Sequence, residues 1–333
     1  MLTRSRVLFD AGTVTRTIQT FVFMLLTALT SPVCSGAVKL DALGAFLVSQ
    51  GYGGSQLVAT RQYYHLPIVA NGKAGHLLVD TGAPTSLIFR SSLQKLNLTE
   101  SKTRMEERGA FGQSKDTLGE TTIGTLTTGN CTLTNVPVAV ANEAAFMNSV
   151  GRPNGLLGLR ELVKFGAILD FSHRLIYLRP SRPGSEISAP IKSMLEKAGF
   201  KAISFSLARG HIRVPGKVND AACHFIVDSG AYLTVLDRDF TNSIKLASAP
   251  TYSEAHGIGK SGGQLRVASF PSLWVGDYQI KQASSAVTTL DSQMIGRGTN
   301  AEVAGLLGVE YIALNSAIID FISGTMYLRP RPK

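Results

Sequence analysis

Two aspartates stand in nearly identical short sequences, 148 residues apart. Asp80 opens the sequence Asp-Thr-Gly-Ala (80–83), and Asp228 opens Asp-Ser-Gly-Ala (228–231). If the two side chains face each other, repulsion between like charges prevents both from ionising easily, so the pair shares one proton. An acid and a base then coexist at one pH, and together they can drive the attack of a water molecule on a carbonyl carbon. The pair titrates as a unit, so neither aspartate is assigned the role of acid or base. This chemistry needs no metal and no cofactor, and we predict neither.

The residues around each aspartate predict how it is positioned. Three apolar residues precede each aspartate and a glycine follows two positions later, which predicts a buried strand that ends in a tight turn. Burying an isolated charge is costly, which favours an arrangement in which the two turns face each other. A short helix is expected after each turn, starting near Ser91 or Ser92 in one case and at Asp237 in the other, because Ser and Asp are good helix N-caps.

The aspartates belong to a longer internal repeat. Residues 65–88 match residues 213–236 without a gap, and Leu-Leu-Gly at 156–158 recurs at 306–308, 150 residues on. An amphipathic stretch precedes each copy and stops at Gly51 or Gly199, which predicts two glycine-capped helices. Short apolar runs bounded by Gly, Asn and Pro predict strands elsewhere. We therefore expect two lobes, 38–180 and 191–333, joined by a Pro-, Ser- and Gly-rich linker at 181–190.

With these motifs the chain resembles the aspartic peptidases that include pepsins and retropepsins, over nearly all of residues 38–333. The resemblance implies a mostly β, bilobal fold with two homologous β-barrel-like lobes and an active-site cleft between them. It implies that Asp80 and Asp228 are catalytic and that the Leu-Leu-Gly segments pack beside the active-site loops. The residues it assigns to the support of those loops are Thr81, Gly82, Ala83, Ser229, Gly230 and Ala231.

Two departures from the pepsin pattern bear on function. The stretch at 106–122, where pepsins carry a flap tyrosine, has Phe111 and no Tyr, so it is closer to the retropepsin type. Candidate substrate flaps are therefore Phe111 and Gly112 in one lobe and Gly257, Ile258 and Gly259 in the other, although their glycines are equally explained by ordinary turns. Ala83 and Ala231 cannot donate a hydroxyl hydrogen bond to the carboxylates, so we expect a mildly acidic to near-neutral pH optimum.

The first 37 residues predict export. Three arginines precede an apolar stretch from Ile18 to about Leu29, and small residues follow at 35–37, a pattern typical of a secretory signal peptide. The apolar stretch is shorter than the roughly 20 residues of a spanning helix, so a cleaved signal and a secreted or periplasmic protein are favoured over an uncleaved membrane anchor. No stable membrane span is expected after cleavage.

Composition restricts the remaining function classes. The chain has 333 residues, of which 44% are hydrophobic and 17% charged, enough for two ordinary cores. Its net charge is +10, but Lys and Arg are scattered, so a basic surface is favoured over a nucleic-acid site. Cys131 and Cys223 lack metal-ligand spacing and are expected to be buried thiols.

These observations favour an aspartic endopeptidase acting on a peptide or protein substrate, as a monomer in which two lobes form a covalent pseudo-dimer. The substrate would add to the protein as an extended strand. The alternative is a peptide-binding protein that keeps the fold without turnover. In a third arrangement the two lobes do not face each other, and the active sites form only in a dimer.

Overall fold

The computed structural model describes residues 42–329 except 102–104, 110–111, 182–183, 257–262, 271, 281–283 and 297–302. The predicted signal peptide, residues 1–37, lies outside this range. Strands dominate the described part of the chain, as the sequence predicts, and they form three sheets.

The first lobe is built on an eight-stranded sheet that closes on itself. In sheet order its strands are β2 (Val58–Thr60), β3 (Tyr63–Ala70), β4 (Lys73–Val79), β9 (Gly155–Leu157), β5 (Leu87–Phe89), β8 (Cys131–Ala141), β7 (Gly112–Thr128) and β6 (Met105–Gly109). β3 also pairs with β7, where Val69 lies opposite Thr127. Alternate residues of β3 and β8 point into a core made of aliphatic and aromatic side chains.

The second lobe repeats this order in a ten-stranded sheet. Its central strands follow in the order β14 (His211–Val218), β15 (Ala221–Val227), β22 (Val303–Leu307), β16 (Val235–Asp237), β21 (Ser284–Thr288), β18 (Gln264–Ser269) and β17 (Ser248–Glu254). β13 (Ser206–Ala208) and β19 (Leu273–Val275) pair with β14, and β20 (Tyr278–Ile280) pairs with β19. β14, β15, β22 and β16 thus occupy the places of β3, β4, β9 and β5, so the sequence repeat is a structural repeat.

A third sheet of six strands is shared by the two lobes. Its order is β1 (Gly53–Gln56), β11 (Leu175–Leu178), β10 (Ile168–Asp170), β23 (Ile318–Asp320), β24 (Thr325–Leu328) and β12 (Lys201–Ser204). β10 pairs antiparallel with β23, and the pairing is centred on Leu169 and Ile319, which are 150 residues apart. Each predicted lobe contributes three strands, so neither lobe completes this sheet alone.

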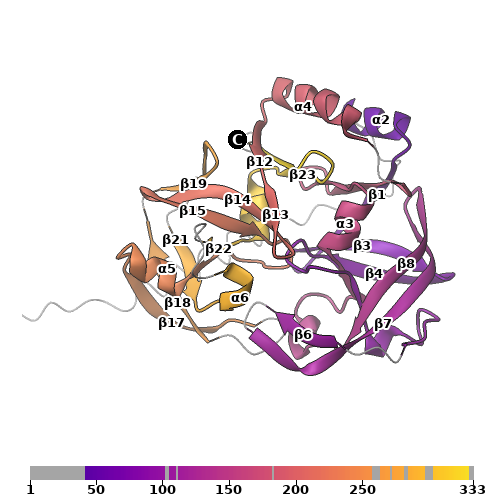
Figure 1. Ribbon diagram of the computed structural model, residues 1–333, viewed down its shortest axis with the longest axis horizontal. Helices are drawn as coiled ribbons and strands as arrows, with labels where there is room; N and C mark the ends of the chain where they lie inside the picture. The colour runs from indigo at the N-terminus through magenta and orange to yellow at the C-terminus, as the bar shows by residue number, and fades with distance from the viewer. Residues whose placement is uncertain are drawn as a thin grey trace, which may run out of the picture. The chain divides into compact units, whose positions relative to one another are not determined.

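Two helices cover the shared sheet (Figure 1). α2 (Ala42–Ser49) and α4 (Ser188–Lys197) lie side by side, and their apolar residues pack with Tyr177 and Tyr327 in one cluster. Gly51 and Gly199 follow the helices with φ of 83° and 84°, so both predicted glycine caps are confirmed. Six of the ten residues of the predicted linker are helical, because η3 (Ser185–Ile187) leads directly into α4, which begins at Ser188.

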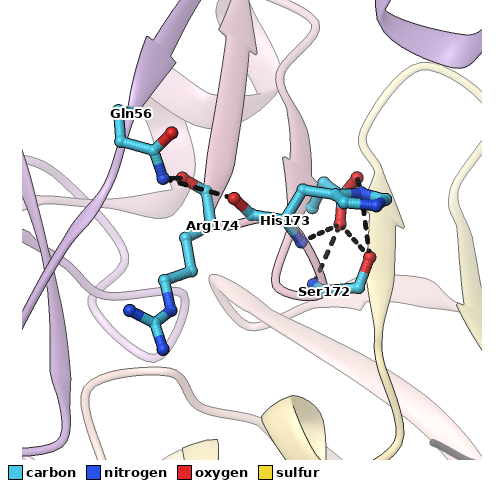
Figure 2. A network of polar contacts seen from close by, with 5 residues as sticks. Gln56, Ser172, His173 and Arg174 are labelled. Atoms are coloured by element: carbon cyan, nitrogen blue, oxygen red, sulfur yellow. Dashed lines mark hydrogen bonds and ion pairs between the residues drawn. The ribbon is translucent and has the colours of Figure 1, made fainter. Parts of the chain in front are cut away.

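The turn between β10 and β11 is held by side-chain hydrogen bonds. Asp170, which is buried, accepts hydrogen bonds from the backbone N–H of Ser172 and of His173 at 2.9 and 3.0 Å. From β1, the amide nitrogen of Gln56 donates to the carbonyl oxygens of His173 and Arg174, as Figure 2 shows. Asp320 makes the same backbone bonds in the second lobe. These two aspartates therefore have a structural role.

The short helices differ between the lobes. α5 (Arg238–Ser243) begins after Asp237, whose side chain accepts from two backbone N–H groups as the sequence predicts. In the first lobe the expected helix is only η1 (Arg90–Ser92), a 3-10 turn that starts one residue early and has no side-chain cap. The other helices follow the repeat: η2 (Ala145–Asn148) and α3 (Leu159–Lys164) in the first lobe, and α6 (Ser292–Ile295) and α7 (Val309–Leu314) in the second.

Candidate active site

Both aspartates stand directly after a central strand of their lobe. β4 and β15 each end at the residue before the aspartate. The backbone N–H of Asp80 donates to the Leu157 carbonyl, and that of Asp228 donates to the Leu307 carbonyl, both at 3.0 Å. β9 and β22 supply these carbonyls, so the Leu-Leu-Gly segments lie beside the two loops as expected.

Two buried hydroxyls bind the loops to each other. Thr81 Oγ1 donates to the Val227 carbonyl at 2.8 Å and accepts from the Ser229 N–H at 3.0 Å. Ser229 Oγ donates to the Val79 carbonyl at 2.8 Å and accepts from the Thr81 N–H at 3.0 Å. Neither residue is exposed to solvent. Four reciprocal hydrogen bonds therefore join the loops, and the arrangement in which the two lobes do not face each other is wrong.

The glycines allow the two carboxyl groups to approach. A Cβ atom on Gly82 would lie 2.4 Å from Cγ of Asp228, and one on Gly230 would lie 2.4 Å from Cγ of Asp80. Each carboxyl group thus rests on the glycine of the opposite loop, and only glycine fits there. The structure therefore brings the carboxyl groups of Asp80 and Asp228 together.

Each carboxyl group is also oriented by its own loop. Asp80 Oδ1 accepts from the backbone N–H of Gly82 at 2.9 Å and of Ala83 at 3.0 Å. Asp228 makes the same two bonds, with the same lengths, to Gly230 and Ala231. All six residues predicted to support the loops therefore lie in the two loops.

Electrostatics place a proton on the pair. Burial raises the pKa of both carboxyl groups, and the neighbouring charge of Asp228 raises the pKa of Asp80 further. The backbone N–H groups of each loop act in the opposite direction but do not reverse the shift. Both residues keep part of their surface accessible. The pair can thus hold one proton and one negative charge where water can reach it.

Two aromatic side chains near the loops were missed by the sequence reasoning. The ring centroid of Tyr63 lies 6.3 Å from that of Tyr232, which directly follows the second loop. Burial and then the charge of Asp228 raise the pKa of Tyr63 to about 12. Burial lowers the pKa of His211, which lies 148 residues after Tyr63, to about 4, although the backbone of Gly82 in the first loop acts in the opposite direction. Tyr63 and His211 are separated by the same 148 residues as the two aspartates, so the internal repeat in the sequence could have pointed to both positions.

A second layer supports each loop through a glutamate. The glycine of each Leu-Leu-Gly segment donates its N–H to the hydroxyl of Ser86 or of Thr234, at 2.9 and 2.8 Å. Glu161 accepts from the Ser86 N–H at 2.8 Å, and Glu310 accepts from the Thr234 N–H. The lobes differ here, because Arg160 forms an ion pair with Glu161 while burial raises the pKa of Glu310 to about 7.

The predicted flaps are only partly described. Each lobe has a hairpin in the corresponding place, β6 with β7 and β17 with β18. Gly112 is the first residue of β7 and pairs with Gly109. Phe111, Gly257, Ile258 and Gly259 lie outside the described residues.

The described ranges contain neither a candidate metal site nor a candidate membrane-spanning helix. Within them, no group of three or more His, Cys, Asp or Glu side chains could hold a metal ion. Cys131 and Cys223 are buried thiols, as predicted. None of the helices that the structure describes is long and apolar enough to cross a membrane.

Comparisons with known proteins agree with this geometry. The model of the family described as "Aspartyl protease" matches the chain twice, at residues 66–160 and 214–311. No curated protein matches the sequence. The structure is similar to the crystal structure of aspartic proteinase from Irpex lacteus, with a TM-score of 0.50 and 10% sequence identity, covering 84% of this chain and 97% of that one. At this identity the likeness shows the fold alone.

Proposed function

Since the chain belongs to the aspartyl protease family, we propose that it is an aspartic endopeptidase in which Asp80 and Asp228 together activate a water molecule. The observation that carries the proposal is the mutual approach of the two carboxyl groups, each against the glycine of the other loop. Burying both carboxyl groups lowers the stability of the fold, and a protein that does not use them in turnover would gain nothing from that loss.

The reaction follows from one proton shared by two carboxyl groups. The ionised carboxylate takes a proton from water as the water oxygen bonds to the carbonyl carbon of the peptide. The protonated carboxyl group donates its proton to the carbonyl oxygen, which gives a neutral tetrahedral diol. Proton transfer to the amide nitrogen then accompanies cleavage of the C–N bond, and the diol collapses to a carboxylic acid and an amine.

Three further expectations belong to the same proposal. One chain supplies both aspartates, so the active species is a monomer, and activity confined to a dimer under native conditions would contradict this. Export follows from residues 1–37, and the N-terminus of the protein recovered outside the cytoplasm should lie near residue 38. Ala83 and Ala231 favour a mildly acidic to near-neutral optimum, and a pH profile that peaks well below pH 3 would contradict it.

The test is cleavage of a diverse peptide library from pH 3 to 8. Asp80→Asn and Asp228→Asn should each abolish cleavage, because either change removes one of the two carboxyl groups. A statine-type inhibitor should abolish cleavage by the unmodified protein. Near-ultraviolet circular dichroism of the variants checks that the fold is kept.

The outcomes separate the proposal from its alternative. Cleavage that survives either substitution would show that the pair is not the catalytic group. Absence of cleavage by the folded, unmodified protein, with peptides bound nonetheless, would favour the non-catalytic peptide-binding protein.

A further inference from the structure

A buried guanidinium lies on β14, close to the active-site loops. Arg213 is only 6% exposed. Successive residues of a strand point to opposite faces, and Ile212 and Val214 point into the core of the lobe. Arg213 therefore lies on the other face of β14, which it shares with His211.

The guanidinium of Arg213 has little hydrogen bonding of its own. Its Nη2 donates to the Met294 carbonyl at a long 3.4 Å, and its buried Nε has no hydrogen-bond partner. No carboxylate in the described part of the chain forms an ion pair with it. A charged group buried without a counter-charge is costly, so this position favours the arrival of an anion.

The neighbouring groups add positive charge. A Cβ on Gly296 would lie 3.2 Å from Nε of Arg209 and 3.2 Å from Nη2 of Arg213, so the two guanidinium groups converge on one place. The charge of Arg209 lowers the pKa of Arg213, after burial, and Arg213 acts in the same way on His224. Arg209 is exposed, so the place where the two meet can be reached from solvent.

This cluster is within reach of a peptide bound at the aspartates. A Cβ on Gly210 would lie 3.1 Å from the side chain of Pro84, so this end of β14 touches the residue that follows the first loop. Two residues along a strand span roughly 7 Å, so Arg213 lies that much farther from the first loop than His211 does. The same distance corresponds to about two residues of an extended peptide bound at the aspartates.

We propose that Arg209 and Arg213 form a subsite for a carboxylate of the substrate, which selects peptides with Asp or Glu two or three residues from the scissile bond. The inference rests on the proposed peptidase function. A guanidinium presents paired N–H donors that match a carboxylate, which neutral side chains do not. Binding of an acidic side chain gives Arg213 a counter-charge, which none of the carboxylates in the described ranges supplies.

The matching place in the first lobe is different, so the preference concerns one side of the scissile bond. His65 corresponds to Arg213, and burial lowers its pKa to about 4, which leaves it neutral at higher pH. Arg61 corresponds to Arg209, and its guanidinium already donates to the Asn148 carbonyl at 2.7 Å.

The test compares cleavage of paired peptides that differ only by Glu or Gln at each position within four residues of the scissile bond. The unmodified protein should prefer Glu at a position two or three residues away, on one side only. Arg213→Gln should lower kcat/KM for the Glu peptide about 10- to 100-fold and leave the Gln peptide nearly unchanged. Arg209→Gln, at an exposed position, tests the same subsite if Arg213→Gln does not fold.

Lys217→Gln is the matched control, because Lys217 lies on the same face of β14, is exposed and is farther from the loops. It should leave the preference unchanged. Cleavage with no preference for Glu at any position, or a preference that survives both arginine substitutions, would overturn the subsite while leaving the peptidase proposal intact.

If no peptide is cleaved, the peptidase proposal fails and the subsite is tested by binding. The Glu and Gln forms of a statine-type peptide are titrated against the unmodified protein and the Arg209→Gln variant. Tighter binding of the Glu form that is lost in the variant supports the subsite, and equal binding of the two forms overturns it.

Discussion

The hydroxyl of Thr81 is predicted to hold the two active-site loops together, and Thr81→Val removes it while nearly conserving the shape of the side chain. The substitution deletes the bond to the Val227 carbonyl and the bond from the Ser229 N–H. Both bonds lie in a region without solvent exposure, where water cannot replace the lost partner. A buried polar group left unsatisfied costs about 1–3 kcal/mol, so two such groups predict a loss of about 2–6 kcal/mol in the free energy of unfolding.

This loss is measured by urea denaturation of the unmodified protein, Thr81→Val and Thr81→Ser. Thr81→Ser keeps the oxygen and removes only a methyl group, so it should cost no more than about 1.5 kcal/mol. Activity should follow the same order, because the carboxyl groups are positioned by the loops that the hydroxyl joins. The reasoning would be refuted if Thr81→Val were as stable as Thr81→Ser, because the hydroxyl bonds would then contribute nothing measurable.

Two further predictions concern the glycines and the histidines. Gly82→Ala places a Cβ 2.4 Å from Cγ of Asp228 and should reduce kcat at least 100-fold. Gly263→Ala is the control and should be nearly neutral, because no atom lies within 4 Å of the new Cβ. Equal effects of the two substitutions on kcat would contradict the steric argument. Burial lowers the pKa of His65 and of His211 from the ordinary 6.5 to about 4 in the folded protein. Each histidine therefore contributes stability that is complete above pH 6.5 and is lost as the pH falls to 4. The loss amounts to up to about 3 kcal/mol for each histidine. Stability measured against pH should therefore fall less steeply over this window in His65→Gln than in the unmodified protein, and parallel curves would exclude the contribution of His65.

Local sequence determined the parts of the site that depend on neighbouring residues. Three apolar residues before each aspartate and a glycine after it specify a buried strand and a tight turn, and both turns form where the sequence places them. The helix caps at Gly51, Gly199 and Asp237 were predicted for the same reason, since capping is a short-range interaction. The helix expected at Ser91 or Ser92 was only a 3-10 turn without a cap, because Ser91 bonds instead to Glu143, 52 residues away.

The segment predicted as a linker contains more regular structure than its composition indicates. Pro, Ser and Gly at 181–190 predicted a linker between the two copies, and residues 188–190 of this segment form the first turn of α4. Proline is tolerated in that turn, because the first N–H groups of a helix have no partner within the helix. Packing of Ile191 and Leu195 against α2 and the shared sheet stabilises the helix that follows.

The internal repeat alone predicts that the protein contains two copies of one unit, with an aspartate at the end of a buried strand in each copy. A constant offset of 148 residues carries that information, and it needs no knowledge of packing. Tertiary packing determines that the copies share a six-stranded sheet, that Thr81 and Ser229 exchange hydrogen bonds, and that Arg213 is buried with no ion pair to a described carboxylate. The first two features join residues about 150 positions apart, and which atoms meet at such a distance depends on how the two lobes pack rather than on the local sequence.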